Sequence, residues 1–147
     1  MISSFNLKLP SQIIIGPGKL AELENNICRF GSRPLLVLGN RSFAATDHYD
    51  AVQGIFAKLG IREKTVHIDT EPSPQMIDTL VAGQCGNDID LVIAIGGGST
   101  IDAGKALAAM LVEGGEITRF LEGVGTAAPS GKKLPFIAMP TTSGTGS

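Results

Sequence analysis

The sequence predicts an α/β fold: a Rossmann-like parallel sheet with helices on both faces and an extended ribbon at the N-terminus. Three short runs, 35–39, 91–95 and 135–140, are apolar at nearly every residue, which is typical of strands buried on both faces. Helical patterns separate these runs, and the connections are short. Strand and helix therefore alternate along the chain, as they do in a parallel α/β sheet.

The first thirty residues predict the ribbon and then a helix. Residues 5–9 and 12–15 are interpreted as two extended segments. Over residues 18–30, apolar side chains recur on one helical face. We expect the ribbon to present an edge through which two copies of the chain pair, so a homodimer is expected.

The alternation continues through the middle of the chain. After the strand at 35–39, a helix is expected at about 49–59 and a strand at 64–69. Ser73 is placed to cap the next helix. Pro74 suits the first helical position, because proline has no N–H to leave unpaired there.

The third buried strand, 91–95, runs into the glycine turn 96–98, and a helix follows with Ser99 as a natural N-cap. The strand at 135–140 ends this series. Between that helix and the last strand, residues 123–133 are rich in Gly, Ala, Ser and Pro, and they form the one stretch that resembles a linker.

Composition limits the possible functions. Residues 1–147 suit a single domain, and 12 basic against 14 acidic residues give a net charge of −2, so no nucleic-acid partner is expected. No apolar stretch has the length of a membrane span, and the N-terminus lacks the pattern of a secretion signal, so no membrane partner is expected. Cys28 and Cys85 lie far apart, which fits a reducing compartment. We therefore expect a soluble cytoplasmic protein.

The glycine turn 96–98 stands where open parallel sheets bind ligands, after a buried strand and before a helix. The first N–H groups of a helix lack partners and carry partial positive charge, so they stabilise a phosphate. Glycine allows the backbone to approach it and to take conformations closed to other residues. The alternative is a tight turn without a ligand. Three successive glycines exceed what a turn needs, so we favour phosphate binding.

Two other phosphate-binding motifs do not fit. The Walker motif fails because Gly104 has no glycine five residues before it, and Lys105 is followed by Ala106. Residues 16–21 match GxGxxA, but Pro17 has no N–H, and no acidic residue follows at the spacing of a ribose-binding carboxylate. A turn into the first helix explains this segment.

Two motifs together resemble a known family. GGGSTIDAGKA at 96–106 and PTTSGTGS at 140–147, with IIIGPGKL at 13–20, are similar to the nucleotide-binding half of the iron-containing (group III) alcohol dehydrogenases. The resemblance covers nearly the whole chain. It implies an N-terminal dinucleotide-binding domain and a C-terminal all-helical domain, which together transfer hydride between NAD or NADP and an alcohol or aldehyde.

The family's reaction uses a divalent metal, Fe²⁺ or Zn²⁺, which polarises the substrate oxygen as a Lewis acid. The resemblance implies that the ligands, one aspartate and three histidines, belong to the helical metal-binding domain, which is absent from residues 1–147. His48 and His67 have no neighbouring ligand at suitable spacing, so we expect surface or capping roles for them. The fragment looks like a truncated product or an isolated domain, and no dehydrogenase turnover is expected from it alone.

The resemblance also assigns coenzyme-binding residues, and it implies no catalytic residue within this chain. The turn from Gly96 to Ser99 would hold the pyrophosphate, Asp102 would lie near the nicotinamide, and threonines would offer hydroxyls from the end of the next strand. For Asp102 the alternative is a solvent-facing ion pair with Lys105, and for the threonines it is a polar loop. The implied residues are Gly39, Asn40, Ser42, Gly96, Gly97, Gly98, Ser99, Asp102, Thr141, Thr142 and Thr145.

The choice of coenzyme depends on the segment after the first buried strand. NAD-specific members of the family carry an aspartate there, whereas this sequence has Asn40, Arg41 and Ser42. A carboxylate would repel the 2′-phosphate of NADP. Its absence predicts that NADP(H) is tolerated beside NAD(H), and a preference for NADP(H) stays open.

Three functions remain open. The first is the coenzyme-binding half of an alcohol dehydrogenase that acts on a small alcohol or aldehyde. The second is a relative of the same architecture, such as glycerol dehydrogenase, maleylacetate reductase or hydroxyacid-oxoacid transhydrogenase. The third is a solitary, non-catalytic nucleotide-binding module. The substrate pocket of the family lies mostly in the other domain, so residues 1–147 do not separate these functions.

Overall fold

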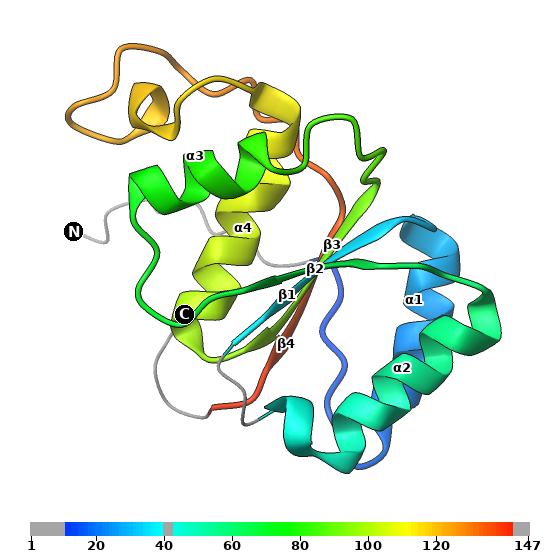
Figure 1. Cartoon of the computed structure of the whole chain (residues 1–147). Helices are drawn as coiled ribbons and strands as arrows, with labels where there is room; N and C mark the ends of the chain where they lie inside the picture. The colour runs from blue at the N-terminus through cyan, green and yellow to red at the C-terminus, as the bar shows by residue number, and fades with distance from the viewer. Residues whose placement is uncertain (1–10, 40–42, 143–147) are drawn as a thin grey trace, which may run out of the picture.

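In the residues that the structure describes, 11–39 and 43–142, four parallel strands form one sheet (Figure 1). The structure is a computed structural model. The strand order is β2-β1-β3-β4. The strands are β1 (Pro34–Leu38), β2 (Lys64–His67), β3 (Leu91–Gly96) and β4 (Phe136–Pro140). The predicted parallel α/β sheet is confirmed.

Helices cover both faces of this sheet (Figure 1). One face carries α1 (Glu22–Phe30) and α2 (Asp47–Leu59), and the other carries α3 (Pro74–Ala82) and α4 (Gly98–Glu113). Short 3₁₀ turns lie at Lys19–Ala21, Phe43–Ala45 and Ile117–Phe120. None of the described helices is long and apolar enough to cross a lipid bilayer.

The central strands are apolar throughout because each face of the sheet meets its own pair of helices. In β1, the buried Leu35 and Val37 belong to the core under α3 and α4. Leu36 and Leu38, also buried, belong to the core under α1 and α2. Successive side chains of a strand point to opposite faces, so a strand covered on both faces is apolar at every position.

Side-chain caps determine where two helices begin. The Ser73 hydroxyl oxygen accepts a hydrogen bond from the Met76 N–H at 3.2 Å, and Pro74 is the first residue of α3, as predicted. Thr46 caps α2 in the same way. Because of this cap, α2 begins at Asp47, two residues before the predicted start.

The predicted N-terminal ribbon is described only in its second half. Residues 12–15 form no strand with any other described residues, and the expected partner, 5–9, lies outside the described residues. Ile13 and Ile15 are 66% and 87% exposed. A strand is defined by its hydrogen bonds to a neighbour, and residues 12–15 make no backbone hydrogen bond to another described segment.

The segment 123–133, predicted as a linker, is an irregular loop that is tied to its surroundings. The Ala127 N–H donates to the Arg119 carbonyl at 2.9 Å, and the Glu113 carboxylate on α4 accepts hydrogen bonds from the Ser130 N–H and hydroxyl. The loop is therefore an anchored part of the domain.

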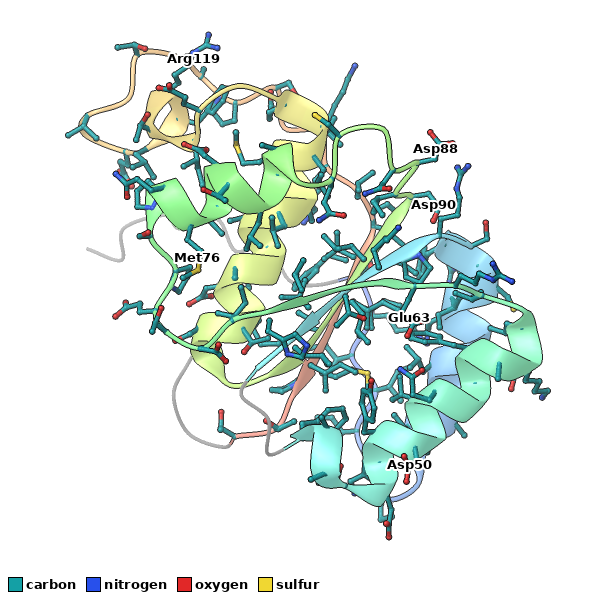
Figure 2. All side chains as sticks on the ribbon, viewed as in Figure 1. Asp50, Glu63, Met76, Asp88, Asp90 and Arg119 are labelled. Carbon is teal, nitrogen blue, oxygen red and sulfur yellow. The ribbon has the colours of Figure 1, made fainter. Side chains whose placement is uncertain are left out.

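At the amino ends of the strands, the Asp90 carboxylate joins the start of β3 to the start of β1 (Figure 2). It accepts hydrogen bonds from the Ser32 N–H at 3.0 Å and the Arg33 N–H at 2.8 Å, and the Arg33 Nε lies 3.4 Å away. Burial raises the pKa of Asp90, but the hydrogen bonds and charge from Arg33 and Ser32 outweigh burial and hold the pKa below its ordinary value. The ionised carboxylate therefore stabilises the fold.

We expect Asp90→Asn to lower the free energy of unfolding by about 1–2 kcal/mol at pH 7, because the charge-assisted hydrogen bonds are lost. The pKa is depressed in the folded state, so this stabilisation is present above the unfolded pKa and disappears as pH falls through the folded value. Urea unfolding between about pH 7 and pH 2 should show that the free energies of unfolding of the wild type and of Asp90→Asn converge below about pH 4. Asp88→Asn, at a side chain 82% exposed, is the control and should change stability little. If Asp90→Asn lowers the free energy of unfolding by the same amount over this whole pH range, the prediction is contradicted.

Candidate functional site

The helices that follow β1 and β3 lie on opposite faces of the sheet. These strands are neighbours, but the chain leaves β1 for α2 on one face and leaves β3 for α4 on the other (Figure 1). A crevice forms outside the carboxyl ends of two such strands, and it is where open α/β sheets bind ligands. The candidate site lies at this edge.

Two glycines allow the ends of β1 and β3 to approach closely. The Gly39 N–H donates to the Ile95 carbonyl at 3.1 Å, and a Cβ on Gly39 would lie 3.6 Å from the Gly96 Cα. A Cβ on the buried Gly96 would lie only 2.8 Å from the Thr100 Cβ. Neither glycine has a left-handed backbone. A side chain at position 96 is therefore excluded by close packing. The φ angle of Gly96 would allow one.

The helix after the glycine turn begins at Gly98, and Gly97 is its N-cap. Ser99 is the second helical residue, so the prediction of Ser99 as the N-cap is wrong. The backbone of Gly97 is extended, and its carbonyl accepts a hydrogen bond from the Ile101 N–H at 3.1 Å. The first turn of the helix therefore starts at Gly97, and Ser99 lies within it. The first N–H groups of α4 have no acceptor within the helix, and this end carries partial positive charge.

The next strand brings two exposed threonines to the same edge. The Thr141 N–H donates to the Gly96 carbonyl at 2.9 Å, and the Thr142 methyl lies 3.6 Å from where a Cβ on Gly97 would stand. The structure thus brings both threonines beside the glycine turn. Three of the predicted site residues, Asn40, Ser42 and Thr145, lie outside the described residues.

Asp102 lies further along α4, on its exposed side. Its carboxylate is 3.1 Å from the Lys105 Nζ, and both side chains are half exposed. The ion pair considered as the alternative is therefore present. A contact between Asp102 and a coenzyme stays a prediction.

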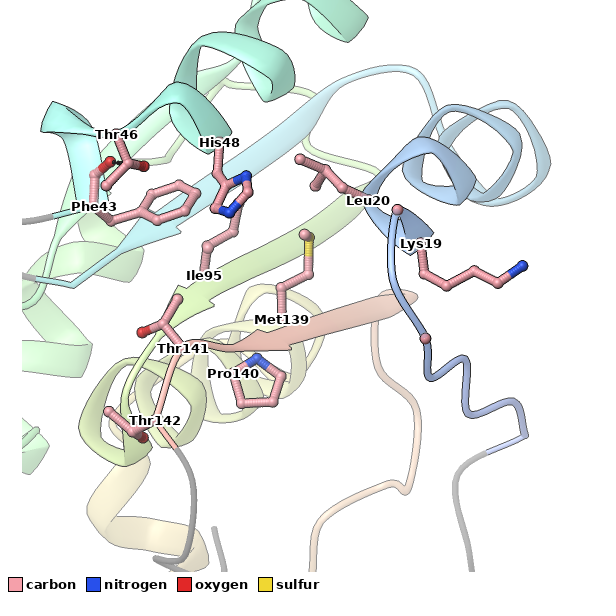
Figure 3. Close-up of a pocket in the computed structure, with 12 residues that line it drawn as sticks. Lys19, Leu20, Phe43, Thr46, His48, Ile95, Met139, Pro140, Thr141 and Thr142 are labelled. Carbon is pink, nitrogen blue, oxygen red and sulfur yellow. Dashed lines mark hydrogen bonds between the residues drawn. The ribbon is translucent and has the colours of Figure 1, made fainter.

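A cavity of about 860 Å³ adjoins this edge on the side of α1 and α2 (Figure 3). The turn before α1, the start of α2 and the carboxyl ends of β3 and β4 form its walls. Phe43 and His48 point toward Met139, whereas Lys19 points away from the other side chains. The lining residues are Gly16, Gly18, Lys19, Leu20, Phe43, Thr46, His48, Ile95, Met139, Pro140, Thr141 and Thr142.

Most of this cavity does not follow from the sequence pattern. Two signals point to it: the GxGxxA match at 16–21, because Gly16 and Gly18 line one wall, and the predicted threonines Thr141 and Thr142, which line another. The predicted turn is confirmed, since Gly18 has a φ of 71° and precedes the 3₁₀ turn that leads into α1. Phe43 and His48 belong to no site motif, and they meet the other walls only in the folded chain.

A metal site does not fit the described residues. Among residues 11–39 and 43–142, no group of three or more His, Cys, Asp or Glu side chains lies close enough together to hold an ion. His48 is exposed near the start of α2, and His67 is exposed at the end of β2. The Fe²⁺ or Zn²⁺ that the resemblance implies therefore has no ligand set here, and no chemical step is assigned to it.

Comparison with known proteins gives a family match over residues 10–147, to the iron-containing alcohol dehydrogenases. The chain is 34% identical to the probable NADH-dependent butanol dehydrogenase 2 of Bacillus subtilis (strain 168). It is 32% identical to the NADPH-dependent butanol dehydrogenase of Clostridium saccharobutylicum. These alignments cover 99% and 93% of this chain but 37% and 35% of the relatives. The chain thus spans little more than a third of their length.

A solved structure shares the fold. The archaeal halo-thermophilic alcohol dehydrogenase ADH/D1 from a Red Sea brine pool is 28% identical and superimposes with a TM-score of 0.82. The match covers 100% of this chain and 39% of that chain. The arrangement of sheet and helices described above is therefore found in one part of a larger protein.

Proposed function

This chain belongs to the iron-containing alcohol dehydrogenase family, and on that premise we propose that it is the coenzyme-binding part of an NAD(P)-dependent alcohol dehydrogenase. The enzyme transfers hydride between the nicotinamide ring and a small alcohol or aldehyde. One observation carries the proposal: the ends of β1 and β3 meet at the crevice of the sheet, and the glycine-rich start of α4 stands beside them.

The pyrophosphate of the coenzyme binds at the start of α4. The N–H groups of Gly98 and Ser99 have no partner within the helix, and the positive end of the helix dipole faces the two negative charges. A Cβ on Gly97 would meet only Thr142, so the glycine leaves the backbone open to a phosphate. Thr141 and Thr142 offer hydroxyl groups from the other side of the turn.

The adenosine half lies along the end of β1. Gly39 is assigned to the coenzyme through its backbone, because a Cβ there would point at Thr100, and Asn40 and Ser42 are assigned to the ribose. No carboxylate occurs between Gly39 and Thr46, so nothing there repels a 2′-phosphate. The named coenzymes of the two relatives, NADH and NADPH, agree with a site of this family that accepts either form.

The nicotinamide end and the substrate occupy the cavity beside α2. Bound NADH or NADPH supplies the hydride. Phe43, Ile95 and Met139 form apolar walls, which suit an aliphatic alcohol or aldehyde and keep water from the reacting atoms. Asp102, on α4 outside the lining of this cavity, is assigned to the nicotinamide side of the coenzyme, and Thr145 is assigned to the coenzyme.

The wider setting of the domain is part of the same proposal. Residues 1–147 form one dinucleotide-binding domain, and residues outside the described ranges hold any Fe²⁺ or Zn²⁺. The protein acts in the cytoplasm as a homodimer, without a nucleic-acid or membrane partner. The exposed Ile13 and Ile15 support dimerisation, because burial of apolar side chains is favourable. A monodisperse monomer in sedimentation at high protein concentration contradicts the dimer.

Fluorescence titration of the purified chain with NADH and with NADPH tests the proposed function. We expect saturable binding of both coenzymes, with Kd values within about tenfold of each other, which corresponds to about 1.4 kcal/mol. Binding of neither coenzyme contradicts the proposed function. A much larger preference for NADH contradicts only the tolerance of NADP(H).

A further inference from the structure

We propose that Thr100 is a positioning residue that sets the gap between the two turns that bind the coenzyme, namely the turn at Gly39 after β1 and the glycine turn 96–98 after β3. The inference rests on the proposed function, because it concerns how the same site is held in shape. Thr100 is the third residue of α4 and is 3% exposed. In the described part of the chain it is the one polar side chain that is buried.

The hydroxyl oxygen of Thr100 lies against both glycines of the crevice. A Cβ built on Gly96 would stand 2.5 Å from the Thr100 Oγ1, and a Cβ built on Gly39 would stand 2.8 Å from the same atom. The Thr100 side chain thus fills the space that side chains at these two positions would need. It connects the end of β1, the end of β3 and the first turn of α4 at one point.

An oxygen atom suits this place better than a methyl group because it is smaller. Thr100→Val keeps the branched shape but brings a methyl group against the backbone of Gly39 and Gly96. Protein interiors are close-packed, so an added methyl displaces its neighbours. Here the neighbours are the two turns themselves, and their displacement changes the gap into which the pyrophosphate fits. Thr100→Ser keeps the oxygen and leaves the gap unchanged.

The first test compares NADH affinity among variants of the full chain. We expect Thr100→Val to weaken NADH binding about tenfold and Thr100→Ser to stay within about threefold of the wild type. Ile77→Val is the matched control. Ile77 lies on α3 in the core under α3 and α4, so this variant loses one methyl group, as Thr100→Ser does, but at a distance from both turns. It should lose stability without a change in Kd.

The second test uses the glycines. Gly39→Ala should weaken NADH binding about tenfold, because its Cβ collides with the Thr100 Oγ1. In a Thr100→Ala background the next atoms are the Gly96 Cα at 3.6 Å and the residue-100 Cβ at 3.9 Å, which are ordinary contacts. Gly39→Ala should therefore cause no further loss of affinity there. Gly96→Ala should not be rescued, because its Cβ stays 2.8 Å from the residue-100 Cβ.

Rescue of Gly39→Ala but not of Gly96→Ala, seen in both NADH affinity and thermal unfolding, supports the inference. Independent losses in the Gly39 and Thr100 variants overturn it, and so does a Thr100→Val variant that binds NADH like the wild type. If the wild type itself binds neither NADH nor NADPH, the proposed function fails and the positioning role fails with it. The two failures are thus distinguished by the wild-type titration.

Discussion

Gly97→Asp is expected to weaken NADH and NADPH binding by about a hundredfold or more while the domain stays folded. Gly97 caps α4 with an extended backbone, and aspartate is at least as favourable as glycine at that position. A Cβ there meets only Thr142, at an ordinary 3.6 Å. The new carboxylate, however, accepts hydrogen bonds from the N–H groups that the pyrophosphate requires. It also repels the pyrophosphate, since like charges about 4 Å apart cost about 4 kcal/mol at an effective dielectric constant of about 20.

Gly97→Ala is the matched control for this charge effect. It adds the same Cβ without a charge, so its binding loss should stay below about tenfold, or about 1.4 kcal/mol. Fluorescence titration measures the affinities, and thermal unfolding checks that both variants are folded. Equal affinities for Gly97→Asp and Gly97→Ala would falsify the assignment of the pyrophosphate to the start of α4.

Leu107→Ala is expected to lower the free energy of unfolding by about 2–5 kcal/mol. Leu107 lies on α4 with no exposed surface, in the core that also contains Val92 and Ala94 of β3. Its removal leaves a cavity between the helix and the sheet that a packed core cannot fully close. In a domain of about this size, each kcal/mol lowers Tm by about 2–4 °C. Urea unfolding followed by circular dichroism measures the loss.

Val112→Ala on the same helix is the control for Leu107→Ala. Val112 is 41% exposed, so its replacement should change the free energy of unfolding by about 0.5 kcal/mol or less. If the two variants lose similar stability, the face of α4 that carries Leu107 does not form the core described here.

The secondary structure could be predicted largely from local patterns. The strands β1 and β3 are apolar at every residue, and this signal is strong because both of their faces are covered. The start of α3 was predictable because Ser73 and Pro74 are local signals that need no tertiary neighbour. The strand expected at residues 12–15 is different, because a strand exists only where a neighbour completes its hydrogen bonds.

The site could be predicted only where it consists of consecutive residues. The glycine turn and the threonines after β4 are continuous motifs, and the structure places both at one edge of the sheet. The sequence predicts Ser99 as the N-cap of α4 because serine is a frequent cap. The N-cap is Gly97, whose extended backbone has no sequence signal. Phe43 and Met139, which line the cavity, are unremarkable hydrophobic residues in the sequence.

By itself, the sequence determined the alternation of strands and helices, the burial of the sheet on both faces and the family motifs. All of these depend on residues close together along the chain. Only the tertiary structure decided that Gly39 and Gly96 serve close approach, that Thr100 lies against both, and that the turn before α1 forms a wall of the cavity. Apart from the contact between Gly96 and Thr100, these are distances between segments far apart in sequence. The parallel pairing of β1 with β3 and of β3 with β4 brings them together, and no local periodicity encodes such distances.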